Sequence, residues 1–294
     1  MADARDGSRP GGGRLLVVGT PIGNLGDLSP RAVAALRDAD LVVAEDTRVA
    51  ARLLGHADLK RPTLSLTEHN ATSRLPALLA RLAAGETLAL TTDAGMPGVS
   101  DPGAALVRAA RAAGASVEVV PGPSAVTAGM ALSGLEAGGF VFGGFLPARP
   151  AAARAARLGE LLAAAGNLGL PLVLFEAPHR VTDLLERLAE VVPGAEVGVF
   201  RELTKLHEET LVGSPADLAT RLTAPRGEFT LVIGGLAPRV GPAVNGRAVV
   251  EAARRQGVSD RGTVELLRAA GLARREAYRL VQESPLSRSA RGDR

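Results

Sequence analysis

Short apolar runs recur along this chain from Arg14 onward, and each is followed by a turn rich in Gly or Pro and then by a longer segment rich in Ala and Leu. This alternation predicts strands that are each followed by a helix, which is typical of an α/β sheet protein. The predicted strands span 15–19, 40–45, 88–93, 117–122, 172–177, 196–202 and 229–235. We therefore expect an α/β fold.

Capping residues indicate where several helices begin or end. Ser29-Pro30 and Asp101-Pro102 each put a capping side chain before a first-turn proline, and Gly114 is expected to end the second of these helices. Ser214-Pro215 predicts a further short helix. Apolar residues at helical spacing predict another helix after 179–180, and they are Val181, Leu184, Leu185, Leu188 and Val192.

A length of 294 residues favours two domains. The segment PGPSA at 121–125 divides the chain into two α/β units, expected at 14–121 and 122–237. The stretch 237–246 is rich in Pro and Gly, which is typical of a linker, and two helix-like halves joined near Gly271 predict a small helical appendage within 245–283. The ends, 1–13 and 284–294, are expected to be a disordered lead-in and a frayed tail.

The chain contains no Cys, which excludes thiolate metal sites, iron–sulfur clusters, a cysteine nucleophile and disulfides. His179 and His207 lack the spacing of zinc ligands, and we expect no metal site. No apolar run approaches the roughly 18 to 20 residues that span a bilayer, and the first 13 residues lack the hydrophobic segment of a secretory signal. We expect a cytoplasmic protein with no membrane partner.

The formal net charge of +3 is unevenly distributed. Eleven Arg and only six acidic residues lie between Asn245 and the end, so the basic excess belongs to this last segment. Lysine occurs only at 60 and 205.

Two glycine-rich loops follow predicted strands, GTPIGNLGD at 19–27 and TTDAGMPGVSDPG at 91–103. Such loops let backbone N–H groups face a ligand at the carboxyl edge of an α/β sheet. The first loop matches neither the dinucleotide-binding nor the P-loop pattern, so those ligands have poor support. Asp101 is explained as a helix cap, whereas Asp93 is a candidate site residue.

Four polar clusters interrupt the apolar segments: AEDTR at 44–48, LTEHN at 66–70, FEAPHR at 175–180 and RELTKLHEE at 201–209. AEDTR could form an ion-pair surface, and the histidine of LTEHN, His69, could be a structural hydrogen-bonding group. Each could also be part of a site. The last two each begin at a strand end and could meet at one edge of a sheet. No G-x-S-x-G motif occurs, which argues against serine hydrolase chemistry.

Taken together and in order, the segments GTPIGNLGDLSPRA, AEDTR, EHN, DAGMPGVSDPG, PGPSA, GFLP, EAPHR, RELTK and GEFTLVIGG strongly resemble the ribosomal RNA small-subunit methyltransferase I family of the tetrapyrrole methylase (class III) superfamily. The resemblance runs from about Gly13 to Gly235, and the tail ending in LARREAYRL is similar to the family's helical C-terminal region. The chain departs from the family pattern at Leu66, at Thr67, at a threonine of TTDAG (91–95) and at Met96.

This resemblance implies two α/β domains with S-adenosylmethionine between them, commonly in a homodimer. It also implies methylation of the ribose 2′-hydroxyl of a cytidine in the decoding region of 16S ribosomal RNA, within the 30S subunit. By matching motif, the residues implied to bind the cofactor are Pro21, Gly23, Asn24, Asp93, Ala94, Gly95, Pro123, Ser124, Glu176, Ala177 and Pro178.

The chemistry of such a transfer suggests catalytic candidates. Displacement at a sulfonium requires mainly alignment of donor and acceptor and exclusion of water. Because a ribose hydroxyl is a poor acid, a cation would stabilise the developing alkoxide, and a carboxylate or a neutral amine could accept the proton. Lys205 is the first candidate, although it could equally contact a phosphate or lie on the surface, and the others are Glu176, His179, Arg201 and Asp101.

Several arginines are candidate phosphate contacts, with a solvated helix face as the alternative. The RNA-binding candidates are Arg48, Arg149, Arg154, Arg157, Arg180, Arg268, Arg274, Arg275 and Arg279. With six Phe, one Tyr and no Trp, stacking on bases cannot be widespread, so shape and charge must dominate recognition.

Two other interpretations stay open. The same fold and cofactor could serve a tetrapyrrole or a protein acceptor, because a fold does not fix a substrate. Alternatively, the chain could be an RNA-binding or ribosome-assembly module whose cofactor pocket has lost its function.

Overall fold

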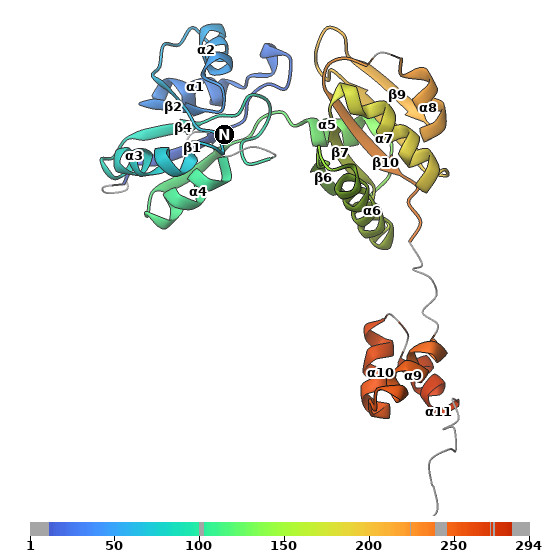
Figure 1. Ribbon diagram of the computed structural model, residues 1–294. Coiled ribbons are helices and arrows are strands. Elements are labelled where there is room, and N and C mark those ends of the chain that lie inside the picture. The colour runs from blue at the N-terminus through green and yellow to red at the C-terminus, as the bar shows by residue number, and fades with distance from the viewer. Residues whose placement is uncertain are drawn as a thin grey trace, which may run out of the picture. The chain divides into compact units, whose positions relative to one another are not determined.

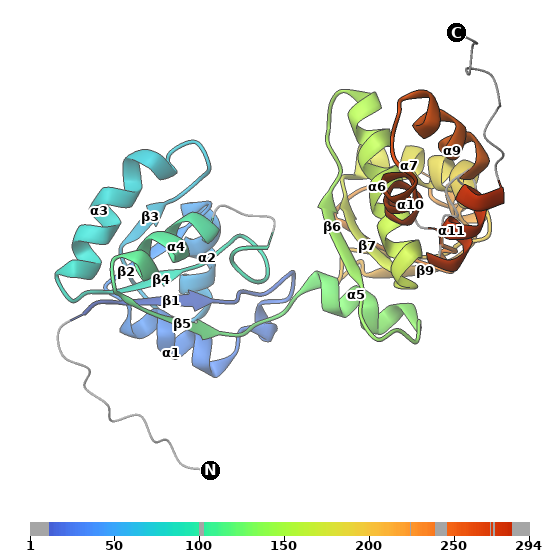
Figure 2. The same cartoon turned by 90° about the horizontal axis from the view of Figure 1, so that it is seen from below.

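The structure is a computed structural model that describes residues 12–99, 103–223, 225–238, 246–270, 272 and 274–283. It divides into two compact units, with the boundary between Pro238 and Arg239. The elements of both units are labelled in Figures 1 and 2.

The first sheet is parallel and has the order β3-β2-β4-β1-β5. Its strands are β1 (Arg14–Val18), β2 (Leu41–Ala44), β3 (Thr63–Ser65), β4 (Thr87–Leu90) and β5 (Ser116–Val120). Helices α1 (Pro30–Asp38) and α2 (Thr47–His56) cover one face, and α3 (Ala71–Ala83) and α4 (Gly103–Ala112) cover the other. Successive residues of β1 serve the two faces, since Leu16 packs with Leu36 whereas Leu15 packs with Leu78.

The second sheet is mixed and has the order β6-β7-β10-β8-β9. Its strands are β6 (Val141–Phe145), β7 (Leu172–Glu176), β8 (Glu196–Arg201), β9 (Glu209–Gly213) and β10 (Phe229–Gly234). Helices α6 (Ala151–Leu168), α7 (Pro178–Val191) and α8 (Pro215–Arg221) pack on one face. On the other face, α5 (Ala125–Ser133) packs beside Phe200, Val173 and Val232.

The helical unit contains α9 (Gly246–Arg255), α10 (Asp260–Ala269) and α11 (Arg274–Glu283). It has a core of its own, formed by Val250, Val264, Leu267, Ala277 and Val281. Within the described part of the chain, no helix is long and apolar enough to span a membrane.

The α/β class and all seven predicted strands are confirmed, although each strand ends one to three residues earlier than expected. The caps at Ser29 and Ser214 are also present, because each side chain accepts a hydrogen bond from the helix it precedes. The predicted cap at Asp101-Pro102 lies outside the described residues, as do 1–11 and 284–294.

The structure also adds elements and moves one boundary. Strands β3, β6 and β9, the 3₁₀ turn η1 (Leu25–Asp27) and helix α9 were not predicted, and α9 begins at the last residue of the expected linker. Gly13, expected in a disordered lead-in, is buried, and its N–H donates to the carbonyl of Leu82 at 2.9 Å. The first strand is therefore anchored from Gly13 onward.

Candidate functional site

Two adjoining cavities lie among the loops that follow the strands of the first unit. The first has a volume of about 490 Å³ and the second about 300 Å³. Both are lined by Ile22, Thr92, Asp93, Ala94 and Glu228. Groups bound in the two cavities would therefore meet at these shared residues.

The loop after β4 forms one wall of both cavities. The backbone N–H of Thr20 donates to the carbonyl of Gly95 at 2.9 Å, and the Thr20 hydroxyl donates to the carbonyl of Thr92 at 3.2 Å. Gly95 has a φ of 83°, a left-handed conformation that favours glycine. These contacts fix the loop against the end of β1, so that Asp93, Ala94 and Gly95 line the first cavity.

Asp93 is linked to the start of α2. Its carboxylate accepts a hydrogen bond from the backbone N–H of Asp46 at 3.0 Å, and the Asp46 side chain in turn pairs with Arg48. The hydrogen bond from Arg48 lowers the pKa of Asp46 to about 2. Burial raises the pKa of Asp93, and the hydrogen bond from Asp46 offsets this only in part. Asp93 is thus a more basic carboxylate than a solvated one.

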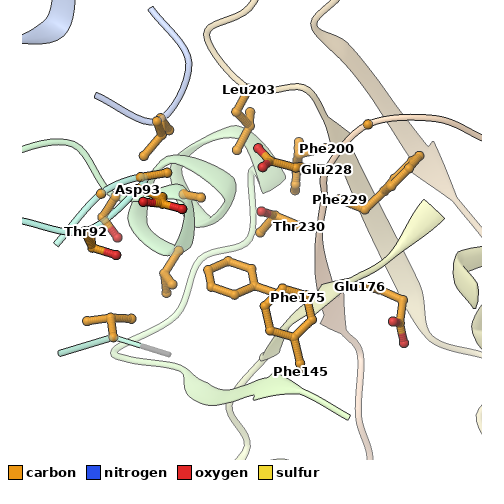
Figure 3. A pocket seen from close by; sticks show the side chains of 18 of the residues that line it. Thr92, Asp93, Phe145, Phe175, Glu176, Phe200, Leu203, Glu228, Phe229 and Thr230 are labelled. Atoms are coloured by element: carbon orange, nitrogen blue, oxygen red, sulfur yellow. The ribbon is translucent and has the colours of Figure 1, made fainter. Parts of the chain in front are cut away.

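The opposite wall of the first cavity is apolar. Figure 3 shows Phe145, Phe175 and Phe200 on this side, with Asp93 and Thr92 across the cavity from them, whereas the ring of Phe229 points away into the core beneath α6 and α7. The rings of Phe145 and Phe175 lie 5.5 Å apart between centroids. Flat apolar surface opposite a few polar groups is typical of a small-molecule site.

Glu176 lines the first cavity, but arginines hold its carboxylate. The side chain is fully buried and forms ion pairs with Arg154 at 3.1 Å and Arg180 at 2.6 Å. One oxygen also accepts the N–H of Ala177 at 2.8 Å, at the start of α7. In Figure 3 the carboxylate points away from Asp93. This arrangement suits a residue that fixes the cavity wall, as the cofactor-binding motif implies, better than a residue that takes part in proton transfer.

Lys205 lines the second cavity between two carboxylates. Its ammonium donates to Glu202 at 2.9 Å and to Glu228 at 2.8 Å. Burial alone would lower the pKa of Lys205, but the hydrogen bonds to Glu228 and Glu202 outweigh it and raise that pKa. The charged form of Lys205 is therefore favoured, which suits stabilisation of negative charge better than the role of a neutral amine base.

The turn that carries Lys205 is strained and contacts the first glycine-rich loop. Glu202 and Thr204 have φ angles of 52° and 67°, unusual for residues other than glycine. The backbone N–H of Asn24 donates to the Thr204 hydroxyl at 3.0 Å. A side chain at Gly23 would meet Lys205 Cγ at 2.5 Å, so only glycine allows this approach.

The residues implied to bind the cofactor are distributed over both cavities. The first is lined by Asp93, Ala94, Gly95, Ser124, Glu176, Ala177 and Pro178, and the second by Pro21 and Gly23 as well as Asp93 and Ala94. Asn24 and Pro123 line neither. The side chain of Asn24 instead caps η1 by accepting the N–H of Gly26.

Of the other catalytic candidates, none lines either cavity within the part of the chain that is described. His179 lies on α7, outside both linings. Arg201 donates to the carbonyl of Arg226 and pairs with Glu209. Asp101 lies outside the described residues.

The arginines proposed to bind RNA differ in availability. Arg154 and Arg180 are largely buried and hold Glu176, so they are less available to an RNA phosphate than the exposed candidates. Arg48 and Arg157 are exposed and pair with Asp46 and Glu160. The remaining candidates are exposed as well, and they are Arg149, Arg268, Arg274, Arg275 and Arg279.

Several residues of the two cavities were not singled out from the sequence. Glu228 belongs to the segment GEFTLVIGG, in which no residue had an assigned role. Arg52 lies in a helix that carried no motif at that position, and the phenylalanines come from separate strands. Position is the signal for Glu228 and the phenylalanines, because each lies near an end of a strand, whereas Arg52 lies in the middle of α2 and has no such signal.

The tetrapyrrole (corrin/porphyrin) methylase family matches residues 14–219. A solved structure of the methyltransferase CobJ superimposes with a TM-score of 0.58 at 24% identity, covering 78% of this chain and 98% of that one. A uroporphyrin-III C-methyltransferase from Thermus thermophilus, solved with S-adenyl homocysteine, gives a TM-score of 0.53 at 20% identity, covering 76% and 98%. The fold is therefore that of the tetrapyrrole methylases.

Relatives found by sequence identify the family more narrowly than the solved structures do. The ribosomal RNA small subunit methyltransferase I of Xylella fastidiosa strain Temecula1 is 45% identical over 230 residues, which is 76% of this chain and 82% of that protein. The protein of the same name from Thermotoga maritima is 40% identical over 225 residues, covering 76% and 99%. The chain belongs to the tetrapyrrole methylases and, among them, to the ribosomal RNA small subunit methyltransferase I family.

Proposed function

We propose that this protein transfers a methyl group from S-adenosylmethionine to the ribose 2′-hydroxyl of a cytidine in the decoding region of 16S ribosomal RNA. Its substrate is the 30S subunit, and it acts in the cytoplasm as a homodimer. The observation that carries the proposal is the pair of cavities that meet at Asp93, one mainly apolar and one lined by Lys205. The names of relatives at 40 to 45% identity support ribosomal RNA as the acceptor.

The first cavity has a lining that fits this cofactor. Its phenylalanine wall offers flat apolar surface for a purine, and Ser124, Thr92 and Glu45 offer polar groups for hydroxyl and ammonium groups. When bound, S-adenosylmethionine supplies a methyl group on a positively charged sulfur, which a nucleophilic oxygen displaces in line. The protein's own part is to orient donor and acceptor and to exclude water.

Lys205 provides positive charge on the acceptor side. Because Glu202 and Glu228 keep it protonated, it stabilises negative charge as the hydroxyl loses its proton. The same two carboxylates hold the ammonium in one position, so little reorganisation is needed during the reaction.

Asp93 accepts the hydroxyl proton in this proposal. It lines both cavities and is more basic than a solvated carboxylate. Glu228 also lines both cavities, but it is hydrogen-bonded to Lys205. Asp93 therefore has the better combination of position and basicity.

The test uses purified protein, radiolabelled S-adenosylmethionine and 30S subunits that lack the modification, with naked 16S RNA in parallel. We expect label in a 2′-O-methylcytidine of the decoding region, located by mass spectrometry, and more label with the subunit than with naked RNA. Label in another nucleotide would retain the enzyme class and reject the position. Label only in a porphyrinoid or a protein would reject RNA as the acceptor.

A further inference from the structure

The second cavity opens beside an arginine for which the proposed function has no role. Arg52 lines this cavity together with Val49, Ala50 and Leu53 of α2. It is exposed, and within the described residues its guanidinium has no hydrogen bond or ion pair. An exposed guanidinium that lines a cavity is suited to a phosphate, which it can bind through two parallel hydrogen bonds.

Arg52 is part of a basic stripe along the exposed face of α2. Arg48, Arg52 and His56 follow one another at intervals of one helical turn, and all three are exposed. Arg48 pairs with Asp46 yet keeps 85% of its side chain exposed. The middle residue of the stripe, Arg52, lines the second cavity, and Arg48 and His56 extend the stripe in both directions along α2, which is labelled in Figure 1.

The linings of the two cavities differ in charge. Asp93, Thr92 and Ala94 are shared with the first cavity, whereas Arg52 and Lys205 belong to the second alone. A nucleotide that enters from the Arg52 side can present its ribose toward Asp93 while its phosphates remain near Arg52. Among the described residues, the lining of the first cavity includes no Arg or Lys.

We propose that the second cavity is the acceptor-nucleotide subsite, and that Arg52 holds the RNA phosphate next to the methylated ribose, with the α2 stripe extending this contact along the strand. This inference rests on the proposed function for the identity of the acceptor. The binding surface itself depends only on the cavity and on the charges of α2.

The test compares Arg52→Ala and Arg52→Lys with Arg108→Ala. Arg108 is a matched control because it is exposed on α4, which packs on the opposite face of the same sheet. Affinity for undermodified 30S subunits is measured at several salt concentrations, together with KM, kcat and the Kd for S-adenosylmethionine.

We expect Arg52→Ala to raise the KM for subunits about ten-fold and to leave the cofactor Kd unchanged, with Arg52→Lys intermediate. The slope of log affinity against log salt should fall by about 1, because the variant neutralises one phosphate fewer. Arg108→Ala should match the wild type. An unchanged slope for Arg52→Ala, an equal loss in Arg108→Ala or a changed oligomeric state for Arg52→Ala alone would overturn the inference.

A second variant tests the cavity rather than the charge. Val49→Phe adds bulk to the second cavity alone, so it should raise the KM for subunits without weakening cofactor binding. Thermal unfolding checks that the variant remains folded. Loss of cofactor affinity in a folded Val49→Phe would instead assign this cavity to the cofactor.

The two proposals fail differently. If the wild type methylates subunits but Arg52→Ala behaves like the wild type, only the subsite is rejected. If Arg52-dependent RNA binding occurs without methyl transfer to RNA, the surface is retained and the proposed activity is rejected.

Discussion

At the scale of single residues, the carboxylate of Glu176 lines a cavity but stabilises the packing of the helices beside it. Its side chain is fully buried, and the two arginines that hold it come from α6 and α7. Removing one partner from a buried charge cluster leaves the others uncompensated, which is more harmful than losing the attraction itself. Glu176 therefore links α6 and α7 through ion pairs at the edge of the first cavity.

We expect Glu176→Gln to lower the free energy of unfolding by about 3–5 kcal/mol, because two largely buried guanidinium groups lose their only described carboxylate partner. Glu186→Gln is the control, since it makes the same charge change at an exposed position of α7 and should shift stability by less than about 0.5 kcal/mol. Urea unfolding measures both. If Glu176→Gln were as stable as the wild type and lost only kcat, the result would instead support a catalytic role for Glu176.

The raised pKa of Asp93 leads to a prediction about how stability depends on pH. Its raised pKa means that the folded protein favours the protonated form, so the wild type loses stability as pH rises from the unfolded value of 3.8 through the raised value. Asp93→Asn should therefore be at least as stable at neutral pH, and any advantage should shrink in acid. Its kcat should fall by about 10²–10⁴-fold if Asp93 accepts the proton.

The pH profile of kcat separates this role from cofactor binding. The wild type should lose activity on the acid side as Asp93 is protonated, and that limb should be missing from Asp93→Asn. A variant that keeps the acid limb, with only a weaker Kd for S-adenosylmethionine, would contradict the assignment.

At the scale of elements, the contact between the first glycine-rich loop and the 202–205 turn positions Lys205. A Cβ at Gly23 would lie 2.8 Å from the carbonyl oxygen of Leu203 and 2.5 Å from Lys205 Cγ. Gly23→Ala should move the turn, lower kcat at least ten-fold and destabilise the protein by about 1–3 kcal/mol. Steady-state kinetics and thermal unfolding measure these effects.

Gly55→Ala provides the control for this substitution. Gly55 lies in α2 with nothing within 4 Å of an added Cβ, so alanine should stabilise the helix by about 0.5–1 kcal/mol and leave kcat unchanged. If Gly23→Ala behaved in the same way, the close approach would have no functional consequence.

The three strands that the sequence did not predict share a physical reason. Strands β3, β6 and β9 are all edge strands, so they lack the continuous apolar runs that marked β1, β2 and β4 in the buried centre of a sheet. The loop of Asp93 was predictable because its density of Gly and Pro follows a strand directly. The pairing of Glu176 with Arg154 was not, because 22 residues separate them and only the packing of α6 beside β7 brings them together.

At the scale of the whole molecule, the chain combines an α/β unit that contains both cavities with a helical unit that has its own core. Eleven Arg against six acidic residues lie from Asn245 onward, so the helical unit belongs to the most basic part of the chain. Within the described residues, Arg268 and Arg279 pair with exposed glutamates, and such surface pairs are weak. Their guanidinium groups can exchange a carboxylate for a phosphate at little cost.

Truncation after Pro238 separates the contributions of the two units. We expect the shortened protein to unfold at nearly the same temperature as the α/β unit of the full chain, because the clusters around both sheets remain complete. Its Kd for S-adenosylmethionine should be unchanged, since all residues lining the first cavity are retained.

Affinity of the truncated protein for 30S subunits should fall, and its salt dependence should become shallower, because the shortened chain neutralises fewer phosphates. Calorimetry and binding at several salt concentrations check these expectations, with replacement of the four candidate arginines of the helical unit by alanine as the comparison. If truncation weakened binding while that replacement did not, the helical unit would contribute through shape or protein contacts rather than through charge. Equal reductions in affinity in the two proteins would assign its contribution to Arg268, Arg274, Arg275 and Arg279.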